Sequence, residues 1–196
     1  MNYLAHLYLA RHDDDAMLGA LLGDFVFGVS GPDAYPPTIR REILLHRKID
    51  RYTDAHPSVV AARALFGDGR RRYAGIALDV YYDHLLARDW LQWSAVDLDI
   101  FTARFYACLR ANHAQLPARL QTIAPSMAQH DWLGSYRERA SVDHAVRRIA
   151  TRLSRNGDKL VACLDDLRAH EAEIAQGFEA LITDLIAQSI ELRPTL

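Results

Sequence analysis

The chain has 196 residues, of which 50% are hydrophobic and 24% are charged, and its formal net charge is −2. This composition is typical of a globular protein, and we expect residues 1–196 to form a single domain. A net charge so close to zero argues against bulk electrostatic binding to nucleic acid or to a membrane surface.

The cysteines and the apolar runs bear on the location of the protein. Cys108 and Cys163 are too few for a disulfide framework and fit a reducing compartment. The first residues show no targeting pattern, and the longest apolar run, residues 16–29, is shorter than the roughly 18 residues of a membrane span. We therefore expect a cytoplasmic protein, and the sequence leaves its oligomeric state open.

Hydrophobic residues recur with helical periodicity in nearly every segment, and no segment shows sustained strand-like alternation. The pattern therefore predicts an all-α fold, a single compact helical domain. Gly31 and Pro32 interrupt the first helical region. Further helices are expected over residues 38–54, 57–66, 70–93, 97–114, 117–130, 141–155 and 158–190. Histidines and aspartates cluster before residue 95, so we expect the chemistry there.

The first candidate for this chemistry is Asp24, which lies in the apolar segment from Met17 to Phe27. If the segment is helical, apolar residues surround the carboxylate on every side. An unpaired buried carboxylate is costly, so we expect a partner for it: a metal ion, another cation or several N–H donors. The alternative is a structural acid that is buried against an arginine or caps a neighbouring helix.

A second candidate group lies on the predicted helix over residues 38–54. His46, Asp50 and Asp54 are spaced four residues apart, which places them on one face of the helix. The basic strip beside this face contains Arg40, Arg47 and Arg51. The alternative interpretation is an ordinary exposed histidine–aspartate pair on a helix surface.

Asp79 and Asp83 are likewise four residues apart, on an otherwise apolar face of the next long helix, and His84 adjoins Asp83. Two carboxylates on such a face repel each other and lose hydration, so we expect a metal ion or arginines to satisfy them. The pair Asp143 and His144 repeats the dipeptide without comparable neighbours, and we interpret it as structural, near a helix start.

Together these segments offer carboxylate and imidazole groups without a thiolate. The candidate metal ligands are Asp24, His46, Asp50, Asp79, Asp83 and His84. Such a donor set suits Mn²⁺, Mg²⁺ or Fe²⁺ better than structural zinc, and ions of this kind promote the hydrolysis of phosphate esters. The sequence has no Gly-x-Ser-x-Gly elbow, no phosphate-binding loop and no dinucleotide-binding glycine motif.

Four segments in this order, residues 1–10, 22–26, 45–57 and 79–90, resemble signatures of the bacterial acyl carrier protein phosphodiesterase family. The resemblance implies an all-α fold like that of the HD-domain phosphohydrolases. It also implies a hydrolase that removes the 4′-phosphopantetheine arm from the serine of holo-acyl carrier protein. Mn²⁺ is the implied cofactor, and the donor set leaves Mg²⁺ or Fe²⁺ as alternatives.

For the site itself, the resemblance implies a metal-site acid and further catalytic residues around it. These residues are Asp24, His46, Asp50, Asp83 and His84. A histidine is expected to act as general acid, and the candidates are His6, His46 and His84. Two alternatives stay open: an HD-like hydrolase of a nucleotide or other small phosphate ester, and a non-catalytic helical module that binds acidic proteins.

The expected substrate also predicts a basic docking surface, because acyl carrier proteins are small, strongly acidic and helical. One candidate is the run Arg70, Arg71 and Arg72, which follows the flexible segment 67–69. The alternative interpretation of this run is a solvated helix start. The second candidate consists of Arg40, Arg47 and Arg51, with Arg41 and Lys48 beside them.

Overall fold

The computed structural model describes residues 1–28 and 31–196, and this part of the chain consists of helices joined by short loops, without a β-strand. The α-helices are α1 (Tyr3–Leu9), α2 (Asp14–Leu22), α3 (Pro37–Ala55), α4 (Pro57–Ala64), α5 (Arg71–Arg88), α6 (Trp90–Trp93), α7 (Leu98–Ala111), α8 (Ala118–Gln129), α9 (Arg139–Ala150), α10 (Gly157–Ala169), α11 (Glu171–Gln176) and α12 (Phe178–Leu192). The short 3₁₀ helices are η1 (Gly31–Ala34), η2 (His113–Gln115), η3 (Gly134–Arg137) and η4 (Arg193–Thr195).

The prediction of an all-α fold is therefore confirmed. The closer relation to HD-domain phosphohydrolases and the single domain over residues 1–196 stay predictions. Within the described residues, no helix combines the length and the apolar character that crossing a bilayer requires.

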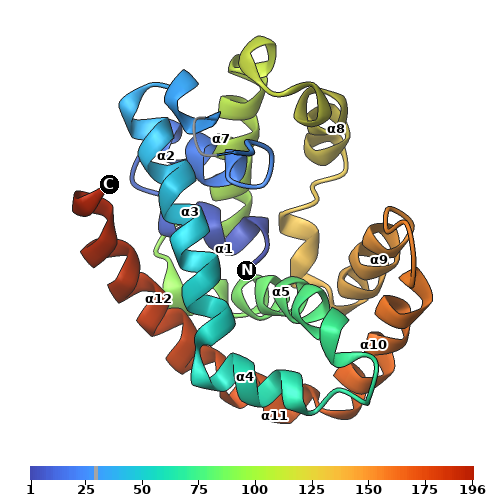
Figure 1. Cartoon of the computed structure of the whole chain (residues 1–196). Coiled ribbons are helices and arrows are strands. Elements are labelled where there is room, and N and C mark those ends of the chain that lie inside the picture. Colours follow the sequence, from blue (N-terminus) through green and yellow to red (C-terminus); the bar gives the residue numbers. More distant parts are fainter. Residues whose placement is uncertain (29–30) are drawn as a thin grey trace.

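The first helical region forms two helices. α1 is short, and most of its residues are buried. α2 begins after Asp13, whose side chain accepts a hydrogen bond from the backbone N–H of Ala16 at 2.9 Å. This cap satisfies a donor at the helix start, which explains why a new helix begins there. α2 then packs against α3 (Figure 1).

α5 lies in the middle of the molecule and packs against α1, α4, α9 and α10. Figure 1 shows α5 next to the N-terminus, with α3 and α12 on one side and α9 and α10 on the other. Large side chains such as Tyr82 and Leu85 are almost completely buried on it. The start of α1 therefore packs against a helix in the middle of the fold.

Two predicted helices are each divided into shorter ones, and the helix predicted over residues 141–155 ends at Ala150. The segment 70–93 breaks at Asp89, and the segment 158–190 is divided at His170 and Gly177. A Cβ atom at Gly177 would lie 2.8 Å from the Cβ atom of Ser58 on α4, so the glycine permits this close contact at the corner between α11 and α12. Helical periodicity continues across such corners, and for this reason it did not reveal them.

Candidate metal centre

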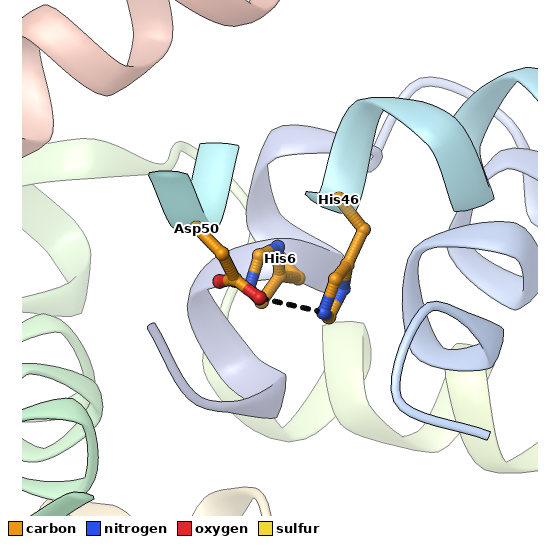
Figure 2. Close-up of side chains that lie close together, drawn as sticks. All are labelled: His6, His46 and Asp50. Carbon is orange, nitrogen blue, oxygen red and sulfur yellow. Dashed lines mark hydrogen bonds and ion pairs between the residues drawn. The ribbon is translucent and has the colours of Figure 1, made fainter. Parts of the chain in front are cut away.

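Two histidines and one aspartate from two helices converge on one point (Figure 2). His6 comes from α1, whereas His46 and Asp50 lie one turn apart on α3. The Nε2 atom of His6 lies 3.0 Å from Oδ1 of Asp50, and Nε2 of His46 lies 3.2 Å from Oδ2 of Asp50. Each residue offers one ligand atom, and these three atoms all lie within 4.8 Å of one another. One cation can contact all three side chains.

Neighbouring groups set the orientation of the His46 ring. Its Nδ1 atom lies 2.7 Å from the backbone carbonyl oxygen of Ala20, on α2. A carbonyl oxygen only accepts, so Nδ1 carries the proton and Nε2 is directed to Asp50, as is common for metal-binding histidines. The ring also stacks on His6, with the two centroids 3.7 Å apart. A Cβ atom at Gly23 would lie 2.2 Å from Cγ of His46, so only glycine leaves room for the ring.

Asp24 belongs to the same group but not to a helix. It lies in a turn after the end of α2, and its side chain is 43% exposed. One carboxylate oxygen lies 3.6 Å from Nε2 of His46. The expectation that Asp24 has no solvated face was wrong, because it assumed that the helix continues through this residue. The expected partner is present, and it is a histidine of the cluster.

The charges of these side chains depend on one another. Burial lowers the pKa of His46, but the contacts with Asp24 and Asp50 outweigh burial and raise this pKa to about 9. Burial and the charge of His46 lower the pKa of His6 to about 4. Burial works against ionisation of Asp50, yet the hydrogen bonds from the two histidines hold its pKa well below the usual range. His46 therefore carries the positive charge beside the two carboxylates, and the stacked ring of His6 is neutral near pH 7.

Asp79 borders this group from α5. The amino group of Met1 lies 3.1 Å from a carboxylate oxygen of Asp79 and 3.3 Å from one of Asp50. Burial raises the pKa of Asp79, and the Met1 amino group opposes this effect. Among the described residues, Asp79 is thus a neighbour of the cluster, and its ligand atoms do not lie with those of the other three residues.

Asp83 binds the backbone of α1 and not the cluster. Its two carboxylate oxygens accept hydrogen bonds from the backbone N–H groups of Leu4 and Ala5, at 2.8 and 3.0 Å. These groups are among the unpaired donors at a helix start, so Asp83 holds the helix that carries His6. Burial raises the pKa of Asp83 to about 7, although the two N–H groups oppose this shift. N–H donors were one of the partners predicted for Asp24, and the structure has them at Asp83 instead.

His84 is also held outside the cluster. Its Nδ1 atom lies 2.7 Å from the backbone oxygen of Tyr136, on η3. The described structure therefore does not bring His84 to the three converging side chains. The pair Asp143 and His144, which repeats the dipeptide, fits its structural interpretation, since Asp143 forms ion pairs with Arg139 and Arg168.

In the first predicted docking run, residues 70–72, two of the three arginines bind other groups of the same chain. Arg70 donates two hydrogen bonds to the carboxylate of Asp166 on α10, at 2.5 and 2.8 Å. Arg71 donates to the backbone oxygen of Phe66 at 3.1 Å, and Arg72 is exposed. The charge of Arg70 is thus neutralised inside the chain, which weakens the prediction that this run binds a partner.

The second predicted docking group flanks the cluster. A cleft of about 680 Å³ opens here, lined by Leu44, Arg47, Lys48, Asp50, Arg51 and Leu196. Arg47 also donates to the carbonyl oxygens of Val26 and Gly28, at 2.7 and 3.1 Å, and so holds the loop after Asp24. Arg40 pairs with Asp33 on η1 at 2.8 Å. Asp54 is exposed and pairs with Arg63, outside the cluster.

The donor set fits a divalent metal ion, with two imidazoles and a carboxylate in contact and Asp24 next to them. From the sequence, His6 was predicted only as a proton donor and not as a candidate ligand. A signal was present: His6 lies in a short helix of apolar and aromatic residues. A polar ring in such a helix needs a polar partner in the core.

Comparisons with known proteins agree on one description. A family model described as acyl carrier protein phosphodiesterase matches residues 1–185. A protein of this name from Serratia proteamaculans is 37% identical over 156 residues, which cover 79% of this chain and 80% of the relative. Relatives of the same name from Pectobacterium atrosepticum and Salmonella dublin are 35% identical, over 100% and 96% of this chain and 98% and 97% of their own lengths. No solved structure matches the chain.

Proposed function

This chain belongs to the acyl carrier protein phosphodiesterase family, and on that premise we propose that it removes the 4′-phosphopantetheine arm from holo-acyl carrier protein. In this reaction a water oxygen forms a bond to phosphorus, and the bond between phosphorus and the serine Oγ breaks. The arm leaves as a phosphate monoester, and the serine oxygen takes up a proton. The observation that carries the proposal is the cluster of His6, His46 and Asp50 in a chain that matches this family.

The proposal includes a divalent metal ion, with Mn²⁺ first and Mg²⁺ or Fe²⁺ as alternatives. His6, His46 and Asp50 would hold it, and Asp24 lies beside His46, with a carboxylate oxygen 3.6 Å from its Nε2 atom. When bound, such an ion supplies Lewis-acid polarisation of a phosphoryl oxygen and activation of a water molecule. The all-α fold and the histidine–aspartate chemistry also support the proposed relation to HD-domain phosphohydrolases.

The protein groups around the cluster suit an anionic substrate. Asp24 is half exposed beside His46, so its free oxygen can accept a hydrogen bond from the attacking water and orient it. Arg47, Lys48 and Arg51 line the cleft at Asp50, where their charges favour the approach of a phosphodiester. These contacts support phosphate chemistry at this site.

Intact-mass measurement of the carrier protein tests the proposal. Holo-acyl carrier protein incubated with the enzyme and Mn²⁺ should lose the mass of the phosphopantetheine arm, and the apo form should appear. A chelator should stop the conversion, and added Mn²⁺ should restore it. The His46→Ala variant should convert little carrier, whereas His84→Ala should retain most of the activity.

A different result would favour the alternative functions. If the metal-loaded enzyme hydrolyses bis(p-nitrophenyl) phosphate but leaves holo-carrier protein intact, the substrate is a small phosphate ester. If the protein binds no divalent metal and turns over neither compound, the enzymatic proposal fails.

A further inference from the structure

Three arginines on α8, on α9 and just after α9 have no carboxylate partner among the described residues. Among the described residues, the ion pairs of arginine involve other positions and not Arg119, Arg148 or Arg152. Arg119 lies at the start of α8, Arg148 in the last turn of α9, and Arg152 just after α9. Figure 1 shows both helices on the same side of α1 and α5. None of these positions was predicted to bind a partner.

Arg119 lies next to the loop of the metal centre. Its guanidinium carbon is 5.5 Å from the ring centroid of Phe25, the residue that follows Asp24. The Phe25 ring in turn stacks on Tyr3, with the centroids 6.2 Å apart. A guanidinium over an aromatic face is held in position and keeps its charge. The charge of Arg119 is therefore placed at the edge of the candidate site.

Arg148 is held by a second aromatic ring. Its guanidinium carbon lies 3.6 Å from the ring centroid of Trp132. Arg148 and Tyr136 both line a cavity of about 290 Å³. The hydroxyl of Tyr136 accepts a hydrogen bond from the side chain of Asn2 at 2.7 Å, and Asn2 directly follows Met1. Tyr136 thus links the wall of this cavity to the N-terminal segment that reaches the candidate metal centre.

These arginines and the carboxylate of Asp24 all affect the pKa of one side chain, Tyr3. Burial raises the pKa of Tyr3, and the carboxylate of Asp24 raises it further. The side chains that oppose this shift are Arg119, Arg152 and Arg148. Burial also lowers the pKa of Arg148, and the neighbouring Arg152 adds to this effect. A half-buried guanidinium beside a like charge is stabilised by an anion.

We infer that Arg119, Arg148 and Arg152, together called the α8–α9 rim, dock the acidic surface of the acyl carrier protein beside the metal centre. The inference rests on the proposed function, which supplies a small acidic partner. Arg119 and Arg152 are exposed, as contacts with carboxylates of another protein require. Phe27, on the loop after Asp24, is 73% exposed and adds an aromatic side chain of the kind that is enriched at interfaces.

Direct binding tests this inference without relying on catalysis. Apo-acyl carrier protein lacks the arm and cannot be hydrolysed, so its affinity for the Mn²⁺-loaded enzyme can be measured by fluorescence anisotropy. The triple variant Arg119→Ser, Arg148→Ser, Arg152→Ser should bind it about tenfold more weakly, because three individually weak charge contacts are lost. Replacement of the same residues by lysine should retain most of the affinity. Binding by the wild type should weaken between 0.1 and 1 M salt, as the Debye length falls from about 10 to about 3 Å.

A matched control removes three positive charges elsewhere. Arg147, Arg110 and Lys159 are exposed on α9, α7 and α10, and their triple serine variant should bind the carrier as the wild type does. Turnover of bis(p-nitrophenyl) phosphate should be unchanged in both triple variants, since this small diester has no acidic surface to dock. Their melting temperatures confirm that both variants fold.

The inference is overturned if the rim variant binds apo-carrier protein as tightly as the wild type, or if both triple variants lose the same affinity. It is also overturned if single-stranded DNA or phosphatidylglycerol vesicles bind the rim as well as the carrier does. An enzyme that binds apo-carrier through the rim but never converts holo-carrier would contradict the proposed function instead. The two hypotheses therefore fail on different measurements.

Discussion

His46 and His84 show how the same residue type acquires different roles. Both are buried, and each Nδ1 atom lies 2.7 Å from a backbone carbonyl oxygen. The difference is at Nε2, which in His46 lies 3.2 Å from Asp50 and 3.6 Å from Asp24. In the described structure no carboxylate pairs with His84. The two histidines therefore form a matched pair for mutation.

We predict that His46→Ala lowers the affinity for Mn²⁺ by at least tenfold, because a ligand of the cluster is lost. His84→Ala should leave the affinity within about twofold of the wild type, since this ring bonds to the backbone oxygen of Tyr136 and lies outside the cluster. Isothermal titration of the metal-free proteins measures both values. Equal losses in the two variants would place the metal elsewhere.

Asp83 acts through the start of α1. We predict that Asp83→Ala lowers the free energy of unfolding by about 2–6 kcal/mol, because two buried N–H groups lose their acceptor and each costs about 1–3 kcal/mol. Asp79→Ala is the control and should cost less, since this side chain is 39% exposed and pairs with the charged Met1 amino group, which Asp50 also contacts. Urea denaturation gives both values, and a variant at Asp83 as stable as the wild type would contradict this role.

At the scale of the helices, the candidate metal centre depends on how closely α2 approaches α3. At the end of α2, the carbonyl oxygen of Ala20 binds the His46 ring, and Gly23 leaves room for the ring because it has no side chain. His6 arrives from α1, whose start is held by α5 through Asp83. The packing of α1, α2, α3 and α5 thus determines the distances between the candidate ligands, which lie on α1 and α3.

We predict that Gly23→Ala reduces Mn²⁺ affinity and activity at least tenfold although no ligand is removed. The added Cβ atom would lie 2.2 Å from Cγ of His46, so the ring must move. Gly75→Ala is the matched control on α5, where a Cβ atom meets no atom within 4 Å. This control should stabilise the protein by about 0.5–1 kcal/mol, because alanine favours the helix. Normal metal binding by Gly23→Ala would show that the ring position is not critical.

For the whole molecule, the cluster connects segments that are far apart in the sequence. His6 and Asp50 are 44 residues apart, and Asp83 contacts Leu4 across 79 residues. An unfolded chain does not hold these groups together, so an ion that they bind stabilises the folded state.

We predict that Mn²⁺ raises the free energy of unfolding by about 2.7 kcal/mol when its concentration is 100 times its Kd. Thermal unfolding with and without a chelator measures this effect as a change in melting temperature. The His46→Ala variant should show a much smaller change at the same concentration. A melting temperature that does not respond to Mn²⁺ in the wild type would contradict metal binding by the folded protein.

The sequence by itself determined the all-α fold and the placement of His46 and Asp50 on one face of α3. Both follow from local periodicity, since residues four apart on a helix lie one above the other. It also identified the segments in which the acids and histidines occur. It did not locate the break after Leu22, because the apolar pattern continues through Asp24.

Only the tertiary structure decided which distant groups satisfy these side chains. It joined His6 to the cluster, gave Asp83 to the backbone of α1, and paired Arg70 with Asp166 across 96 residues. Spacing along a helix defines which residues share a face, but their partners depend on how the helices pack. A buried carboxylate can be stabilised by a metal ion, an arginine or backbone N–H groups, and the sequence near the carboxylate is compatible with all three.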